Sequence, residues 1–205
     1  LTTPPASCTQ LPIQTFRVNS GVADTARVGG ERPSVADTGA GGTGAIMNAS
    51  GVFTTAGGSA TLNGQAQSIS SVTLGTTNVT GVDFGYNFDT IVNTNDSGQG
   101  SLRQFIINSN ALTGNASLAQ SGSTISTRGA TSVLPAGKET SIFMIPNGAA
   151  RPGLLATVPS QLTSGVAVIQ LSSAATTTST LPIITDSDTI IDGGTQTFNI
   201  ANSNT

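Results

Sequence analysis

The chain has 205 residues and a formal net charge of −3, and only 8% of its residues are charged, against about 25% in a typical domain. The seven basic residues occur singly and histidine is absent, which excludes a clustered cationic face for nucleic acid or anionic membranes, a serine–histidine–aspartate triad and the usual zinc sites. No apolar run approaches the roughly 20 residues of a membrane-spanning helix, so we expect neither nucleic-acid binding nor membrane insertion.

Residues 1–20 are predicted to form an extended N-terminal arm. Three prolines disfavour a helix there, and the apolar residues partly alternate with polar ones, as they do in a β-strand. The only cysteine, Cys8, cannot form a disulfide within the chain, so it is free, pairs with another chain or has lost its partner through processing. The apolar residues of the arm are Leu11, Ile13, Phe16 and Val18.

Residues 21–92 are predicted to form a β-sandwich-like module of short strands joined by long loops rich in glycine, alanine and threonine. The clearest strand covers residues 82–88, where apolar and polar residues alternate at every position. This alternation predicts an antiparallel strand with one buried face. The residues expected on that face are Val82, Phe84, Tyr86 and Phe88.

Residues 93–205 are predicted to form a capping helix followed by β-helix-like strands. Ser101 is a good N-cap, and the apolar residues after it fall on one face at a spacing of three to four, which predicts a helix from Ser101 to about Leu112. Arg103 has few ionic partners nearby, so we expect it to donate to backbone carbonyls or to Asp96. The apolar face of the helix carries Leu102, Phe105, Ile106 and Leu112.

The rest of the chain carries short apolar runs that end at glycine, proline, asparagine or aspartate. Residues 113–140 are predicted to be mostly loop. Strands are then expected at residues 142–146, 166–171, 181–184 and 189–193. Short strands at fairly regular intervals favour a β-sandwich or a β-helix.

Two separated motifs carry a resemblance to a known family. Residues 98–106 have the sequence G-Q-G-S-L-R-Q-F-I, and residues 181–185 and 189–193 have the sequences L-P-I-I-T and T-I-I-D-G. They resemble the entry of right-handed parallel β-helices in large secreted bacterial surface proteins of the adhesin type. The resemblance implies that the S-L-R helix caps the open end of a β-helix and that the later strands form its first coils.

The strand at residues 82–88 also resembles the last strand of small β-sandwich modules, related to collagen-adhesin B-type domains, that often precede such a β-helix. The chain is therefore expected to be all-β. Its N-terminal part would be β-sandwich-like, followed by a capping helix and the first coils of a β-helix or a second β-sheet layer.

Three aspartates near the C-terminus are the strongest candidates for chemistry. On a strand, Asp186 and Asp188 would face the same side about 7 Å apart, a separation that suits an inverting glycosidase. The sequence around them is also typical of turns, which we favour, with weak calcium binding by Asp186, Asp188 and Asp192 as the remaining alternative. We therefore predict no catalytic residue and no cofactor.

The favoured hypothesis is an extracellular structural or adhesive protein of a bacterial surface, in which identical subunits form a filament by β-strand addition. A surface of hydroxyls and amides is common in secreted β proteins. The N-terminal arm and residues 193–205, which lack charge and proline, are predicted to supply the two joining edges. The candidate structural and assembly residues are Cys8, Leu11, Ile13, Phe16, Val18, Ser101, Leu102, Arg103, Phe105 and Ile106.

Two other hypotheses stay open. The chain could be a carbohydrate-processing parallel β-helix enzyme, a lyase or glycosidase, that uses Asp186, Asp188 and Asp192. It could instead be a passive module that binds surface glycans or host proteins. Loss of activity on replacing the aspartates would favour the enzyme, and sedimentation as a polymer would favour the filament.

Overall fold

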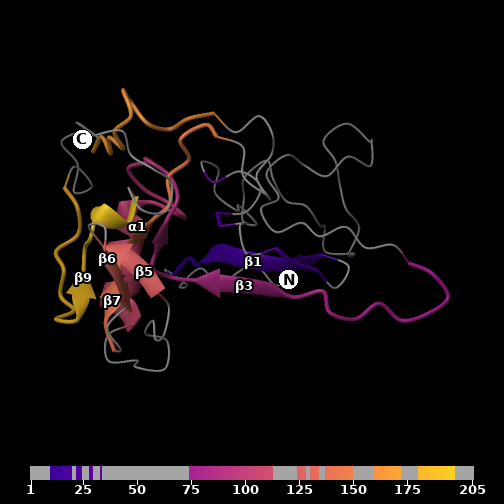
Figure 1. Ribbon diagram of the computed structural model, residues 1–205. Coiled ribbons are helices and arrows are strands. Elements are labelled where there is room, and N and C mark those ends of the chain that lie inside the picture. The colour runs from indigo at the N-terminus through magenta and orange to yellow at the C-terminus, as the bar shows by residue number, and fades with distance from the viewer. Residues whose placement is uncertain are drawn as a thin grey trace, which may run out of the picture.

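The computed structural model describes residues 10–19, 22–24, 28–29, 33, 74–112, 124–127, 130–133, 137–149, 159–171 and 180–196 (Figure 1). Cys8 and residues 197–205 lie outside them, as do the side chains of Phe16 and Val18. The elements are β1 (Ile13–Asn19), β2 (Val22–Asp24), β3 (Phe84–Asn87), β4 (Thr90–Ile91), α1 (Leu102–Leu112), β5 (Thr124–Thr127), β6 (Ala130–Val133), β7 (Glu139–Thr140), β8 (Ile142–Phe143) and β9 (Thr189–Ile190).

The N-terminal arm is the central strand of a sheet. β1 pairs in antiparallel fashion with β2 on one side and β3 on the other, in the order β2-β1-β3. The expectation that this arm lacks a partner in its own chain is therefore wrong, because both of its hydrogen-bonding edges are in use. The pairing of β1 with β3 has a register shift, a β-bulge or similar irregularity, between Gln14 and Phe16.

The strand expected at residues 82–88 is present as the shorter β3, and its antiparallel pairing is confirmed. The expected buried face is only partly correct. Phe84 and Phe88 are half-buried, whereas Tyr86 is 51% exposed. β3 is an edge strand of the sheet, and a phenol hydroxyl tolerates contact with water better than a purely apolar side chain does.

Three segments that are distant in sequence lie side by side as parallel strands. β4 pairs with β8, with Thr90 opposite Ile142, and β7 pairs with β9, with Glu139 opposite Thr189. The backbone N–H groups between β7 and Met144 alternate in direction: those of Ile142 and Met144 donate to the β4 side, and that of Ser141 donates to the carbonyl of Ile190 at 2.9 Å. Residues 139–144 therefore lie between β4 and β9.

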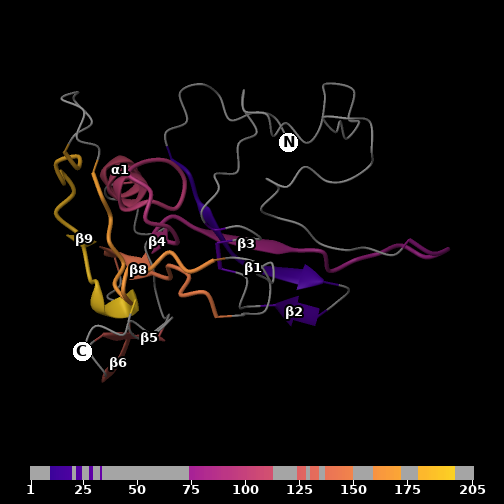
Figure 2. The same cartoon turned by 90° about the horizontal axis from the view of Figure 1, so that it is seen from above.

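Parallel pairing needs a long connection between the strands. The connection from β4 to β7 contains α1 and the antiparallel hairpin of β5 and β6. In Figures 1 and 2 the parallel strands and α1 lie together at one end of the structure, and β1, β2 and β3 extend toward the other. The parallel β-helix stays a prediction, and these two parallel pairs are the features that support it.

The main core lies between α1 and the parallel strands. Phe105 and Ile106 of α1 are each 1% exposed and form one cluster with Ile91, Phe143 and Ile145. The predicted helix and its packing against strands after residue 140 are therefore confirmed. The partly buried residues around this cluster are Leu102, Leu162, Ala167, Ile169 and Leu181. Leu112 is half-buried and lies outside the cluster, unlike the expectation.

A second core cluster joins the N-terminal arm to the rest of the chain. It contains Ile13, Val28 and Val92, with Met144 packed against them. Gly100 lies beside it with a φ of +76°, where an added Cβ would be 2.6 Å from Val92 Cγ2. Only glycine fits this position, both because of the contact and because of the left-handed backbone.

The strands expected at residues 166–171 and 181–184 are not regular strands in the structure, apart from a single antiparallel bridge between Thr163 and Val166. Their apolar residues still pack on the main core, through Ala167, Ile169 and Leu181. Other apolar residues of these runs, Val168, Ile183 and Ile184, are 50%, 83% and 42% exposed. In the second run, the Asn110 side chain binds the Ile183 carbonyl.

Candidate functional site

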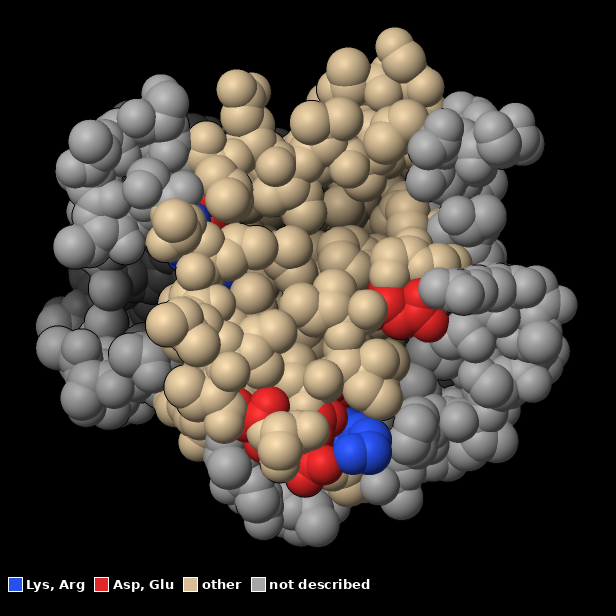
Figure 3. All heavy atoms as spheres, turned by 90° about the vertical axis from the view of Figure 1, so that its left-hand side faces the viewer, with Lys and Arg blue, Asp and Glu red and all other residues tan. Residues whose placement is uncertain are grey.

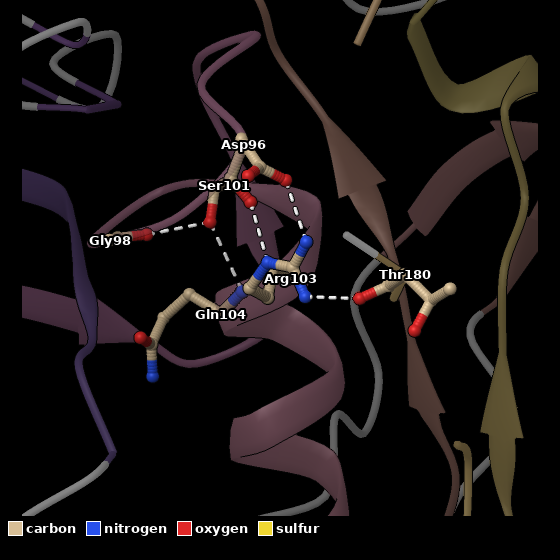
Figure 4. A network of polar contacts seen from close by, with 6 residues as sticks. All are labelled: Asp96, Gly98, Ser101, Arg103, Gln104 and Thr180. Carbon is tan, nitrogen blue, oxygen red and sulfur yellow. Dashed lines mark hydrogen bonds and ion pairs between the residues drawn. The ribbon is translucent and has the colours of Figure 1, made fainter. Parts of the chain in front are cut away.

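The start of α1 is held by the residues that the sequence singled out (Figure 4). Ser101 is 1% exposed, and its Oγ accepts a hydrogen bond from the Gln104 N–H at 3.1 Å. The same hydroxyl donates to the Gly98 carbonyl at 2.7 Å. The predicted N-cap is therefore confirmed, since the bond to the third helical residue is the bond that an N-cap makes.

Arg103 joins the linker before α1 to a distant part of the chain. Its Nε donates to the Asp96 carbonyl at 2.9 Å, and its Nη2 forms an ion pair with Asp96 Oδ1 at 2.6 Å. Its Nη1 donates to the carbonyl of Thr180 (Figure 4). The prediction that Arg103 bonds to backbone carbonyls and to Asp96 is confirmed. Because the guanidinium is buried, losing one of these partners would leave a costly unpaired charge.

Two buried side-chain amides bind a peptide group as a neighbouring strand would. Asn108 of α1 accepts from the Leu11 N–H at 3.0 Å and donates to the Leu11 carbonyl at 3.1 Å and the Phe88 carbonyl at 2.9 Å. Gln196 accepts from the Ile145 N–H and donates to the Ile145 carbonyl, each at 2.8 Å. An amide has both a donor and an acceptor, so one side chain can satisfy both backbone groups of a residue.

Two further amides do the same with neighbouring backbone groups. Asn110 donates to the Ile183 carbonyl and accepts from the Thr185 N–H, both at 2.8 Å. Gln161 accepts from the Thr94 N–H at 3.3 Å and donates to the Val92 carbonyl at 3.4 Å. We call these four side chains the amide clamps: Asn108, Asn110, Gln161 and Gln196.

The segment after Asp192 was expected to be an unguarded strand edge. This is wrong for residues 194–196, and residues 197–205 lie outside the described part of the chain. Residues 194–196 form a helical turn, and Thr195 and Gln196 are 0% and 3% exposed. The Thr195 hydroxyl accepts a hydrogen bond from the Phe143 N–H at 2.9 Å, next to the Gln196 clamp. The two side chains therefore cover the edge of β8 and of the residues just after it, and their polar atoms are used within the chain.

A pair of buried carboxyl groups lies where β7 meets the segment before β9. Glu139 of β7 and Asp186 are each 5% exposed, and their side chains are hydrogen-bonded to each other. Asp186 also accepts from Thr189 Oγ1 at 3.0 Å and from Ser109 Oγ of α1 at 3.4 Å. The hydroxyl groups of Ser109 and Thr189 contact each other as well.

The surroundings move the pKa values of the two carboxyl groups apart. Burial, and then the hydrogen bond with Asp186, raise the pKa of Glu139 from its usual 4.5 to about 7. Burial also acts to raise the pKa of Asp186, but hydrogen bonds from Glu139, Thr189 and Ser109 outweigh it and lower that pKa below its usual value. Between these two pKa values the pair therefore holds one proton, which Glu139 donates to the Asp186 carboxylate.

An ion pair between Lys138 and Asp188 lies near the two carboxyl groups. Lys138 Nζ lies 2.6 Å from Asp188 Oδ1, and both side chains are partly exposed. The hydrogen bond and the charge of Asp188 raise the pKa of Lys138. Figure 3 shows a small group of acidic and basic side chains at the lower edge of a face whose described part is otherwise largely uncharged.

The three aspartates predicted for chemistry do not form one site. Asp186 is buried in the carboxyl pair, Asp188 binds Lys138, and Asp192 Oδ1 accepts from the Gly194 N–H at 2.8 Å. Asp186 and Asp188 do not face the same side of a strand, because a turn at residues 187–188 separates them from β9. Among the residues that the structure describes, no group of three or more His, Cys, Asp or Glu side chains could hold a metal ion.

Two further predicted assembly residues, Leu11 and Ile13, have structural contacts within the chain, whereas Cys8 and the side chains of Phe16 and Val18 lie outside the described part. Leu11 is bound through its backbone by Asn108, and Ile13 is buried in the second core cluster. Sequence reasoning missed Glu139, which lies in a segment predicted as loop, and it missed the amide clamps. The polar run N-S-N at residues 108–110 was the available signal, because buried polar residues on a helix need partners from another segment.

Comparisons with known proteins give no relative: no family model, no curated protein and no solved structure matches this chain. In the described part of the chain, no helix is long and apolar enough to cross a membrane.

Proposed function

We propose that this chain is an extracellular structural or adhesive module of a bacterial surface protein, which functions through strand pairing and shape. The observation that carries the proposal is the pair of parallel contacts, β4 with β8 and β7 with β9, packed against a capped helix. Stacked parallel segments with a helix over one end are the architecture that the sequence motifs imply.

The distribution of polar groups supports the same proposal. The buried amides of Asn108 and Gln196, the Thr195 hydroxyl and the Arg103 guanidinium bind the chain's own backbone or carboxyl groups. Side chains used in this way stabilise a shape. No cofactor enters this proposal, and the ligands expected for an adhesive role are surface glycans or host proteins.

We propose further that identical subunits associate through the outer edge of β9. β1 and residues 195–196 have their partners within the chain, whereas β9 is an edge strand among the residues that the structure describes. Ile183, Ile184 and Ile191, which flank it, are 83%, 42% and 45% exposed. An edge strand with apolar neighbours favours addition of another strand, because both sets of backbone groups and the apolar surface are then covered.

Analytical ultracentrifugation over a wide range of concentration tests this association. We expect the unmodified chain to sediment as oligomers or polymers and Ile191→Lys to sediment as a monomer, because a charge at the edge opposes strand addition. Leu74→Lys is the matched control, since Leu74 is 82% exposed and lies before β3, and it should associate normally. A chain that stays monomeric at high concentration would contradict the proposal, and electron microscopy would identify a filament directly.

A carbohydrate-processing enzyme is the second candidate, and one observation favours it. Two carboxyl groups with pKa values moved apart are the usual acid and base of glycoside hydrolysis. Here both are buried, and Asp186 accepts hydrogen bonds from Ser109 and Thr189 of the same chain, which favours a structural role. Release of reducing ends from a panel of polysaccharides, abolished by Glu139→Gln, would replace the structural proposal with this one.

A further inference from the structure

The carboxyl pair joins three separate segments of the fold. Glu139 belongs to β7, Asp186 belongs to residues 181–188 before β9, and Ser109 belongs to α1. Glu139 is also the register partner of Thr189, whose hydroxyl donates to Asp186. A change in the charge of this pair therefore acts on the contact between β7 and β9 and on the contact of both with α1.

Two buried carboxyl groups in contact cannot both be ionised without strong repulsion. The charged groups around the pair are Asp89, Lys138 and Asp188, while α1 contributes only the uncharged Ser109 and Asn110. Lys138 is the one cation among these groups, and it is already paired with Asp188 at 2.6 Å. Loss of the shared proton therefore leaves a second negative charge that no group nearby neutralises fully.

We propose that Glu139 and Asp186 form a proton-operated latch that holds residues 181–190 against β7 and α1. The latch is closed while one proton lies between the two carboxyl groups. When that proton is lost, the like charges repel each other and the contact between β7 and β9 weakens. This inference concerns the fold itself and is independent of the proposed function.

The sign of the pH dependence follows from the two groups separately. Glu139 has a raised pKa in the folded state, so its contribution is complete below its usual 4.5 and is lost as the pH rises through about 7. Asp186 has a lowered pKa, so its contribution is present above its usual 3.8 and is lost as the pH falls below that value. The latch is thus strongest in mildly acid solution and opens in mildly alkaline solution.

Amide hydrogen exchange measured by NMR at pH 5 and pH 8.5, corrected for the intrinsic exchange rates, tests the latch on the full chain. The Ser141 N–H donates to Ile190 and reports the β9 side, whereas the Met144 N–H donates to Ile91 and reports the β4 side. We expect protection of Ser141 to fall about tenfold or more at pH 8.5, since tenfold corresponds to one pKa unit. Protection of Met144 should change much less. Equal protection of Ser141 at both pH values would overturn the proposal.

Two variants identify the group responsible. Glu139→Gln keeps the shape and the hydrogen-bond donor but does not titrate, so protection of Ser141 should become the same at both pH values. Asp83→Asn replaces an exposed carboxyl and should leave the pH response unchanged. A response that persists in Glu139→Gln would show that another group causes it. If Glu139→Gln does not fold, titration of the Glu139 side-chain carbon decides: an apparent pKa near 7 supports the latch, and one near 4.5 refutes it.

Discussion

In this protein, individual side-chain amides form the contacts between distant segments that charged side chains form in many other proteins. With 8% charged residues in the sequence, few ion pairs occur in the part of the chain that the structure describes. Four side-chain amides instead bind backbone groups of distant segments: Asn108, Asn110, Gln161 and Gln196. A side-chain amide costs less free energy to bury than a charge does, and its two hydrogen bonds fix the position of the partner segment.

Replacing Asn108 with Ala is expected to destabilise the chain by about 3 kcal/mol, because the Leu11 N–H and two carbonyls lose their buried partner. Asn110→Ala is the matched control, since the bonds of Asn110 are exposed, and it should cost about 1 kcal/mol or less. Urea unfolding of both variants gives the comparison. Equal losses would mean that the Asn108 bonds are not worth more than solvent-exposed ones.

At the same scale, Phe105→Ala is expected to cost about 3–5 kcal/mol, because it removes the largest fully buried side chain of the main core. Ile107 lies two residues further along α1 and is only half-buried, so Ile107→Ala should cost far less. Thermal unfolding followed by circular dichroism measures both. A small loss for Phe105→Ala would contradict the assignment of α1 to the core.

At the scale of elements, sequence patterns within one segment predicted structure well. They gave no information on contacts between distant segments. The capping serine and the three-to-four spacing lie within one segment, so α1 and its N-cap could be predicted from sequence. The parallel pairs could not, because β7 and β9 are two-residue strands whose partners are fixed by the core and not by a turn.

The aspartates show the same limit for the candidate site. Asp186 was visible in the sequence, but its partner Glu139 lies in a segment without a periodic pattern, and only the register of β7 with β9 brings the two together. Apolar runs also predicted strands at residues 166–171 and 181–184, where the backbone forms no regular ladder. Packing on the core was predicted correctly for Ala167, Ile169 and Leu181. It was not for the exposed Val168, Ile183 and Ile184.

At the scale of the whole molecule, the N-terminal arm is part of the fold. β1 is the central strand of its sheet, and Ile13 belongs to the same core cluster as Val92 and Met144. Deletion of residues 1–20 should therefore cost at least about 3 kcal/mol, from Ile13 alone, and lower the Tm by about 6–12 °C. A control that lacks residues 1–9 keeps β1 and should retain the original Tm in calorimetry. Equal Tm values for both deletions would contradict this placement.

The bond between Arg103 and Thr180 spans 77 residues, and this imposes an order of events on synthesis. A chain that is made from its N-terminus presents Arg103 long before Thr180 exists. At about 5–20 residues per second, the wait is about 4–15 s. Until Thr180 has been made, one hydrogen bond of the guanidinium cannot form, and the core beside α1 still lacks Leu181. The contacts of α1 are therefore completed only after these 77 further residues have been added.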